Sequence, residues 1–178
     1  MLTLDDIRQL VRDAFRDVPP PPPWCLANSL EGEEPRLLER DFAAVRGLHW
    51  SVLEHTFLDR APGGFGTALS FFSDQAFRFY LPAYLLAALD GSLQQADPVF
   101  HLTHGLCPPE ATSPVNPLRF GARTWRDAAA HRLSVFTPPQ ASAIRAFLLW
   151  TAQSPSTSPD DRQRICTAVE TYWGARAV

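Results

Sequence analysis

The segment Phe77–Tyr84 carries the residues whose types and spacing are best suited to bind a ligand. Its sequence, FRFYLPAY, places Arg78 in an otherwise apolar stretch, followed by Tyr80 and Tyr84. A guanidinium among apolar residues must reach water or find a partner, and it can hold a carboxylate or phosphate through paired hydrogen bonds. A binding site would have Arg78 grip an anion while Tyr80 and Tyr84 hydrogen-bond nearby. The structural alternative, which we favour, has Arg78 tie its helix to a neighbour, with Asp74 as one possible partner.

A second group of potential ligands lies in the segment FHLTHGLCPPE. His101, His104 and Cys107 follow one another at intervals of three residues, and Glu110 comes next. Zinc uses imidazole, thiolate and carboxylate ligands, but this spacing matches none of the pairings typical of structural zinc. The two prolines after Cys107 also cut short any helix that could hold the group together. We therefore expect an ordinary loop here, with no metal and no other cofactor.

Other catalytic patterns are missing from the sequence. His49 and His55 are six residues apart, which places them on different faces of a helix and gives little support for a general-base pair. No GxSxG, GxGxxG or HExxH motif occurs. All 16 basic residues are arginine, so a Walker-type phosphate loop and Schiff-base chemistry both lack their lysine. Cys25, Cys107 and Cys166 are isolated and odd in number, which argues against a disulfide framework and for a reducing compartment.

Length and composition indicate an ordinary helical protein. A chain of 178 residues, 46% hydrophobic and 20% charged, can bury one core, so we expect a single domain over residues 1–178. Ala and Leu (23 and 22) far outnumber Val and Ile (9 and 3), which favours helix over strand. The net charge of −3 argues against nucleic acid as a partner. The acidic N-terminal segment and the lack of a long apolar run predict a cytoplasmic protein with no membrane contact.

Capping residues and apolar periodicity predict where the helices lie. Thr3 with Asp6, Thr137 with Gln140, and Ser158 before Pro159 each form a typical helix start. The glycines at 63, 64 and 66 predict a turn. The pattern is weakest over residues 92–132, which we expect to be irregular. The expected helices cover residues 4–16, 34–45, 49–58, 74–89, about 137–151 and about 158–173.

The helix expected over residues 74–89 is apolar on all sides, which is typical of a buried central helix. Ser73 is its predicted N-cap, and Asp90-Gly91 its end. Pro82 lies inside it and deletes one backbone hydrogen bond, so we expect a kink near Arg78. The alternative is two short helices that meet at Pro82.

Residues 17–33 form a proline-rich connection that contains five consecutive prolines, Pro19–Pro23. Such a run adopts an extended, semi-rigid conformation. It could serve as a ligand for a domain with an aromatic groove. We favour a stiff spacer that follows the first helix and lays Trp24 on the surface of the core.

Three stretches together resemble a known family. These are Glu34 to Trp50 with Asp41-Phe42, the segment LSFFSDQAFRFYLPAYLLAAL, and the segment RLSVFTPPQASAIRAFLLW. They are similar to an uncharacterised family of small bacterial proteins with a Phe-Arg-aromatic-Tyr-Leu-Pro-Ala signature, here Phe77–Ala83. The likeness spans about residues 31–150 and leaves out the proline run and the final helix. It implies a bacterial, helix-rich protein and transfers no catalytic residues.

The sequence thus predicts an all-α fold, an irregular or orthogonal bundle of five to seven helices around a buried central helix. The favoured function is a non-catalytic protein-binding module of bacterial type, such as an adaptor or an immunity-like protein. Missing catalytic motifs, acidic charge and plentiful aromatic residues support this interpretation. The alternative is a small enzyme or an anion-binding protein that uses a pocket around Arg78.

Overall fold

The computed structural model describes residues 2–29, 31–62 and 68–177, and within them the chain is all-helical, as predicted. Apart from two isolated β-bridges, Ala27 with Phe72 and Pro114 with Thr124, these residues form no strand. Six of their α-helices have nine or more residues, in line with the five to seven expected. The turn expected at glycines 63, 64 and 66 lies outside the described residues.

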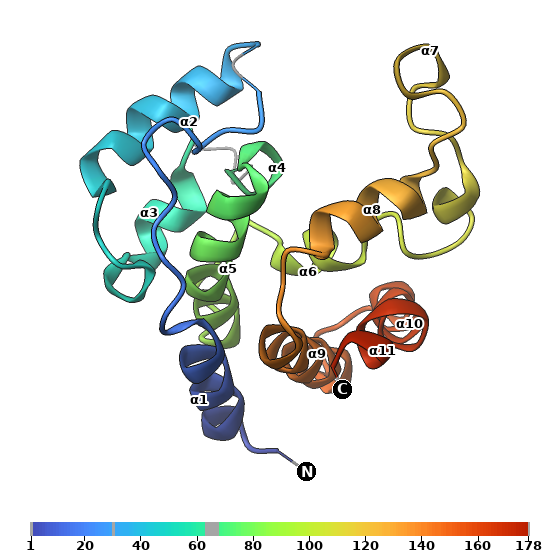
Figure 1. The fold of residues 1–178 in the computed structure, drawn as a ribbon. Coiled ribbons are helices and arrows are strands. Elements are labelled where there is room, and N and C mark those ends of the chain that lie inside the picture. The colour runs from blue at the N-terminus through green and yellow to red at the C-terminus, as the bar shows by residue number, and fades with distance from the viewer. Residues whose placement is uncertain (1, 30, 63–67, 178) are drawn as a thin grey trace. The chain divides into compact units, whose positions relative to one another are not determined.

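The helices, traced in Figure 1, group into two compact units. We call them the N-terminal unit, Arg8–Pro98, and the C-terminal unit, residues 2–7 and 99–177. The expectation that the whole chain forms one domain stays a prediction.

Helix α1 (Leu4–Phe15) begins with the predicted cap. The Asp6 N–H donates to Thr3 Oγ1 (3.2 Å), and the Thr3 N–H donates to Asp6 Oδ2 (2.8 Å). This exchange satisfies two backbone donors that the first helical turn leaves without a partner. Ile7, Val11 and Phe15 lie on the buried side of the helix.

The rest of the N-terminal unit is a set of helices that surrounds one long helix, α5. Helix α2 (Glu34–Phe42) continues into the 3-10 helix η1 (Ala43–Val45), which matches the helix expected over residues 34–45. Gly47 follows with φ +84°, a conformation that favours glycine and ends the helix. The remaining elements are η2 (Trp50–Val52), α3 (His55–Arg60), α4 (Ala68–Phe71) and α5 (Asp74–Leu89).

Helix α5 is the buried helix that the sequence predicts, with the predicted bounds. Ser73 caps it by accepting a hydrogen bond from the Ala76 N–H (3.1 Å). Ten of its sixteen residues are buried. The helix runs without interruption through Pro82, so the alternative of two short helices that meet there is wrong.

The helix predicted over residues 49–58 is wrong, because the structure contains two short helices there. Leu53 and Glu54 between them are extended, with ψ of 130° and 137°. Trp50 is buried and donates its indole N–H to the Phe15 carbonyl (3.2 Å). This tertiary bond fixes Trp50 independently of the helix that follows, and so it overrides the local helical pattern.

The sequence predicts that the proline run lays Trp24 on the surface of the core, but the structure places Trp24 in solvent. Trp24 is 86% exposed, whereas Leu26, two residues on, is 5% exposed. The Cys25 N–H donates to the Pro22 carbonyl (2.9 Å), and this turn directs Leu26 rather than Trp24 inward. The prediction for Trp24 is therefore wrong.

The C-terminal unit ends in two long helices with the predicted caps. In α9 (Pro138–Gln153), Thr137 and Gln140 form a capping box. In α10 (Pro159–Ala168), Ser158 Oγ accepts the Asp161 N–H (3.1 Å). A π-helical turn, η4 (Val169–Trp173), and α11 (Gly174–Arg176) extend α10 to the end of the described chain.

Residues 92–132, expected to be irregular, hold several short helices. They include α6 (Pro98–Thr103), the 3-10 helix η3 (Glu110–Thr112) and α7 (Pro117–Phe120), and α8 (Trp125–Leu133) begins there. The first three of these have too few residues for apolar periodicity to reveal them. One signal was present in the sequence: Thr124 and Asp127 form the capping box that starts α8.

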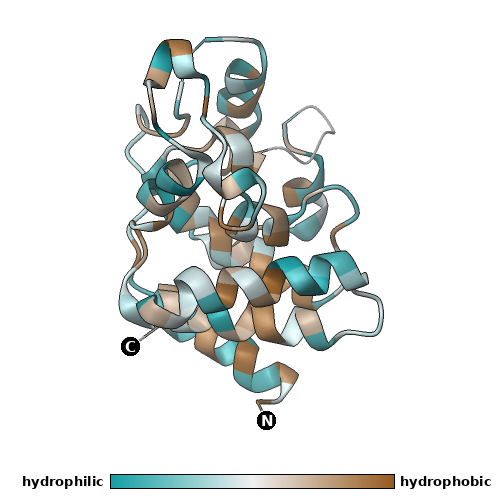
Figure 2. Cartoon of the chain, turned by 90° about the vertical axis from the view of Figure 1, so that its right-hand side faces the viewer, coloured by the Kyte–Doolittle hydropathy of each residue, from teal (hydrophilic) through white to brown (hydrophobic). Residues whose placement is uncertain are grey.

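Hydrophobic and hydrophilic residues alternate around the helices in Figure 2, as expected of amphipathic helices packed on a core. Among the described residues, no helix combines the length and the apolar character needed to cross a membrane.

Candidate functional site

Helix α5 carries all three residues predicted to bind a ligand, but on different sides. Tyr80 and Tyr84 are four residues apart, so their side chains leave the helix on the same face. Arg78 precedes Tyr80 by two residues and leaves on nearly the opposite face. Arg78 is half-buried, and it does not line the pocket that contains Tyr80. The binding role of the three residues stays a prediction.

Tyr80 lies in an aromatic cluster. Its ring stacks on Phe72 (5.0 Å between centroids) and meets the edge of Phe42 (5.0 Å). Burial raises the pKa of Tyr80 to about 12, with smaller opposing effects of Arg46, which lowers it, and Glu39, which raises it. Tyr80 is therefore a neutral hydrogen-bonding group at any physiological pH.

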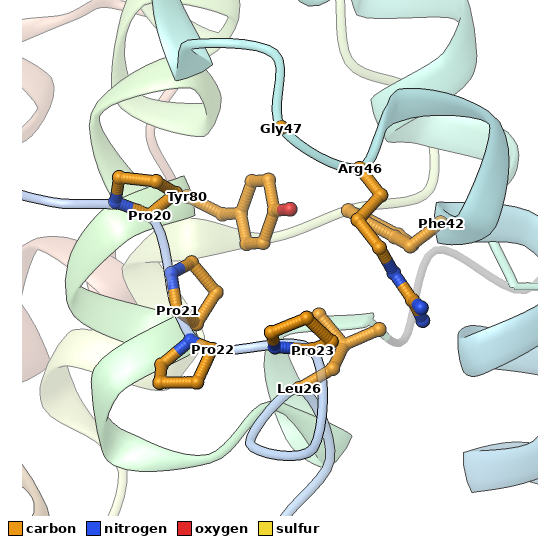
Figure 3. A pocket seen from close by; sticks show the side chains of 9 residues that line it. All are labelled: Pro20, Pro21, Pro22, Pro23, Leu26, Phe42, Arg46, Gly47 and Tyr80. Atoms are coloured by element: carbon orange, nitrogen blue, oxygen red, sulfur yellow. The ribbon is translucent and has the colours of Figure 1, made fainter.

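The proline run covers Tyr80. Figure 3 shows Pro20–Pro23 along one side of a recess whose other side is formed by Tyr80, Phe42 and Arg46. The recess has a volume of only about 20 Å³, which is room for little more than one water molecule. The run thus packs on aromatic residues of its own chain, and no larger ligand reaches Tyr80 while it does so.

Arg46 is the cation nearest to Tyr80 in this recess, and the sequence analysis missed it. Its guanidinium forms an ion pair with Glu39 (3.2 Å). Arg46 comes from the end of η1, far from Tyr80 in sequence, and Gly47 turns the chain directly after it. No local sequence pattern could have revealed that Arg46 lies near Tyr80, because their proximity depends on how α2 packs on α5.

Tyr84 is fully buried, and its hydroxyl has no hydrogen-bond partner among the described residues. Burial raises its pKa, so the hydroxyl stays neutral. A buried donor without a partner costs about 1–3 kcal/mol. We predict that Tyr84→Phe leaves the free energy of unfolding unchanged or raises it by about 1 kcal/mol. Urea denaturation checks this, and a loss above about 1 kcal/mol would show that the hydroxyl has a partner.

The residues His101, His104, Cys107 and Glu110 do not converge on one point. His104 Nδ1 pairs with Glu110 (3.2 Å), whereas the Cys107 thiol donates to the Arg164 carbonyl (3.2 Å). Burial, with smaller effects of Arg132 and His104, lowers the pKa of His101 to about 4, and burial raises the pKa of the Cys107 thiol. Across the part of the chain that the structure describes, no three His, Cys, Asp or Glu side chains are placed to hold a metal ion.

His49 and His55 also have different surroundings. His49 Nδ1 is 2.8 Å from Ser51 Oγ, and its Nε2 is 3.3 Å from the Arg16 carbonyl. These bonds give His49 a structural role at the start of η2. His55 is exposed at the start of α3.

A further surface feature is a loop over residues 113–124, which we call the projecting loop. Figure 1 shows it carrying α7 away from the start of α8. Two backbone bonds close its base: the Val115 N–H donates to the Arg123 carbonyl (2.9 Å) and the Trp125 N–H to the Ser113 carbonyl (3.0 Å). At the tip, Asn116 in a left-handed conformation caps α7 by accepting the Arg119 N–H (3.2 Å).

The start of α8, where the loop ends, is anchored to the segment that follows α6. Gly105 makes this possible: a Cβ there would come within 2.8 Å of the Trp125 carbonyl oxygen. Arg126 donates to the Leu106 carbonyl (3.0 Å), and the Trp125 ring packs on His104 (4.8 Å between centroids). The base of the loop is therefore fixed on the unit by backbone and side-chain contacts.

The tip of the projecting loop exposes apolar side chains. Leu118 is 102% exposed and Phe120 is 43% exposed. The Arg119 guanidinium lies 5.3 Å from the centre of the Phe120 ring, as in a cation–π contact. The loop contains two arginines and no acidic residue, in a chain whose net charge is −3. No sequence pattern predicts this loop, because its Leu-Arg-Phe triplet has no helical or strand period.

In a comparison with known proteins, a family model described as a family of unknown function (DUF6714) matches residues 3–177. No curated protein and no solved structure matches the chain. The match is wider than residues 31–150, over which the sequence resemblance extends, and it includes the proline run and the final helix. Because the model covers nearly the whole sequence, the chain belongs to DUF6714, a family without an assigned function.

Proposed function

We propose that this protein is a non-catalytic protein-binding module whose contact element is the projecting loop. The observation that carries the proposal is the complete exposure of Leu118 beside Phe120 at the tip of a loop with a fixed base. Burying one such side chain against a partner contributes about 1.5–3 kcal/mol. A loop that is already ordered loses little conformational entropy on binding, so most of that contribution is kept.

The charge of the loop supports a particular kind of partner. Arg119 and Arg123 flank Phe120 with no acidic residue in the loop. Arginine and aromatic side chains are the usual anchors of protein interfaces, and opposite charge on the partner increases the rate of association. The partner surface is therefore an apolar pocket with an acidic rim.

The alternative function, anion binding or catalysis around Arg78, has less support. It requires Arg78 to act together with Tyr80 and Tyr84, which leave α5 on another face. It also requires an opening beside Tyr80, where the proline run leaves about 20 Å³.

Four broader attributes belong to the same proposal. The absence of lysine supports a bacterial origin from a GC-rich genome, and the segment Phe77–Ala83 serves as the family signature. Cys25, Cys107 and Cys166 are all free, which supports a reducing, cytoplasmic location. The negative net charge argues against nucleic acid as the partner.

The test is to compare partners of the tagged full chain with those of a Leu118→Ser/Phe120→Ser double variant, expressed at native level in the source cell. We expect at least one protein that co-purifies with the wild type to be recovered about tenfold less with the double variant. Val52→Ser is the matched control, because Val52 is also an exposed apolar residue, at 62%, but lies in η2.

Thermal melts of all three proteins should coincide, since neither loop side chain is part of the core. The proposal fails if every co-purifying protein is recovered equally with the wild type and the double variant.

A further inference from the structure

A polar cleft in the N-terminal unit has no role in the proposed function. We call it the α1–α5 cleft, because α1 and α5 form two of its walls and η2 with the start of α3 the others. Its volume is about 230 Å³. This is larger than the dry cavity of about 150 Å³ that holds a benzene molecule in an engineered protein, and smaller than most pockets for drug-sized ligands. The cleft therefore has the size for a small metabolite.

The floor of the cleft is apolar and fixed. Trp50, Ala83 and Ala87 line it and are all buried. The Trp50 indole cannot swing out without breaking its hydrogen bond to the Phe15 carbonyl (3.2 Å). The floor is apolar, and it offers a small surface to the uncharged part of a ligand, because Trp50 is 2% exposed and each alanine 6% exposed.

The rim of the cleft carries charges of both signs. Arg12, Glu54 and His55 line it, and their side chains have no hydrogen bond or ion pair with other described residues. Asp90, also on the rim, differs from these three because Arg8 holds it (2.5 Å). The cleft thus presents one guanidinium and one carboxylate that are both available to a ligand.

We propose that the α1–α5 cleft binds a small zwitterion of the free α-amino acid class. The ligand carboxylate pairs with the Arg12 guanidinium, and the ligand ammonium pairs with the Glu54 carboxylate. The ligand side chain lies on the floor formed by Trp50 and the two alanines. This inference is independent of the proposed function, because it uses no residue of the projecting loop.

The same charges disfavour other ligand classes. A phosphate would meet two carboxylates, Glu54 and Asp90, against one available guanidinium. An uncharged apolar molecule would leave Arg12 and Glu54 to lose hydration without gaining a partner. Only a ligand with both charges satisfies the two groups together.

The test uses the common free α-amino acids as probes, each in millimolar excess over the full-length protein, with thermal melting as a screen and calorimetry to measure affinity. We expect at least one amino acid to raise the melting temperature by mass action. Its amide, which lacks the carboxylate, and its deaminated acid, which lacks the ammonium, should each bind about tenfold more weakly or worse.

Two variants assign the contacts. Arg12→Gln should bind the amino acid and its amide equally, and Glu54→Gln should bind the amino acid and its deaminated acid equally. Arg36→Gln and Glu31→Gln are the matched controls, since both residues are exposed in the same unit and outside the cleft. The inference is overturned if no amino acid binds, or if one binds Arg12→Gln and Glu54→Gln as tightly as the wild type.

Discussion

Trp173→Ala is expected to lower the free energy of unfolding by about 4 kcal/mol, the largest effect of any single substitution considered for this protein. Trp173 is fully buried in η4 and packs against Tyr172 (5.1 Å between centroids) and Phe136 (6.0 Å). Its indole N–H donates to the Leu102 carbonyl (2.9 Å), which links the end of the chain to α6. The substitution removes the hydrogen bond and leaves a large cavity in the C-terminal unit.

Trp173→Phe separates the two contributions. It keeps most of the ring but leaves the Leu102 carbonyl without its donor, so we expect a loss of about 2 kcal/mol. Urea denaturation, followed by circular dichroism, measures both variants. Equal stability of Trp173→Ala and the wild type would show that the C-terminal helix does not pack on α6 as described.

Asp59→Ala is expected to lower the free energy of unfolding by about 3 kcal/mol. One oxygen of this buried carboxylate accepts the backbone N–H groups of Gln94, Gln95 and Ala96 at 2.8–3.0 Å. Gln94 and Gln95 are exposed, so water can replace the carboxylate there, whereas Ala96 is buried and its N–H would lose its only described partner.

Asp59→Asn keeps an acceptor oxygen but not the charge, and should cost about half as much, because hydrogen bonds to charged groups are the stronger ones. Burial acts to raise the pKa of Asp59, but the three backbone donors outweigh it, and the pKa in the folded protein is lowered. The carboxylate therefore stabilises the fold above the pKa of an unfolded aspartate, near 4, and this stabilisation is lost as the pH falls below that value.

A denaturant series between pH 7 and pH 2 reads out this dependence. The difference between the wild type and Asp59→Asn should shrink as the pH falls. A difference that stays constant would mean that the charge of Asp59 contributes nothing.

The helix starts were the most predictable part of the fold, because caps are local. Thr3 with Asp6, Ser73 and Thr137 with Gln140 each satisfy donors within one turn, so a few adjacent residues are enough to identify them. The bounds of α5 followed from the same kind of signal together with an apolar stretch that only a buried helix explains.

The failures share a cause, which is that distant contacts decided the local structure. The helix expected over residues 49–58 is split because Trp50 is held by the Phe15 carbonyl, on another helix. Trp24 points outward, whereas Leu26 is buried and is held by a distant contact, because its carbonyl accepts the Ser73 N–H (2.8 Å). Neither contact leaves a trace in the spacing of neighbouring residues.

The candidate sites could be predicted only in part for the same reason. Sequence placed Tyr80 in the core correctly but joined it with Arg78, whereas packing of α2 on α5 brings Arg46 to it. The α1–α5 cleft draws its lining residues from four elements, and the projecting loop depends on the close approach of Trp125 to Gly105. Such sites become visible only when the elements are assembled.

Site-specific photo-crosslinking at the tip of the projecting loop tests the central claim most directly. A photoreactive amino acid at position 118, in the full chain and in the source cell, should form a crosslink to a discrete protein partner. The same amino acid at position 52, an exposed apolar position in η2, should not crosslink to that partner. If position 118 yields no adduct, or only the adducts that position 52 yields, the projecting loop is not a binding element.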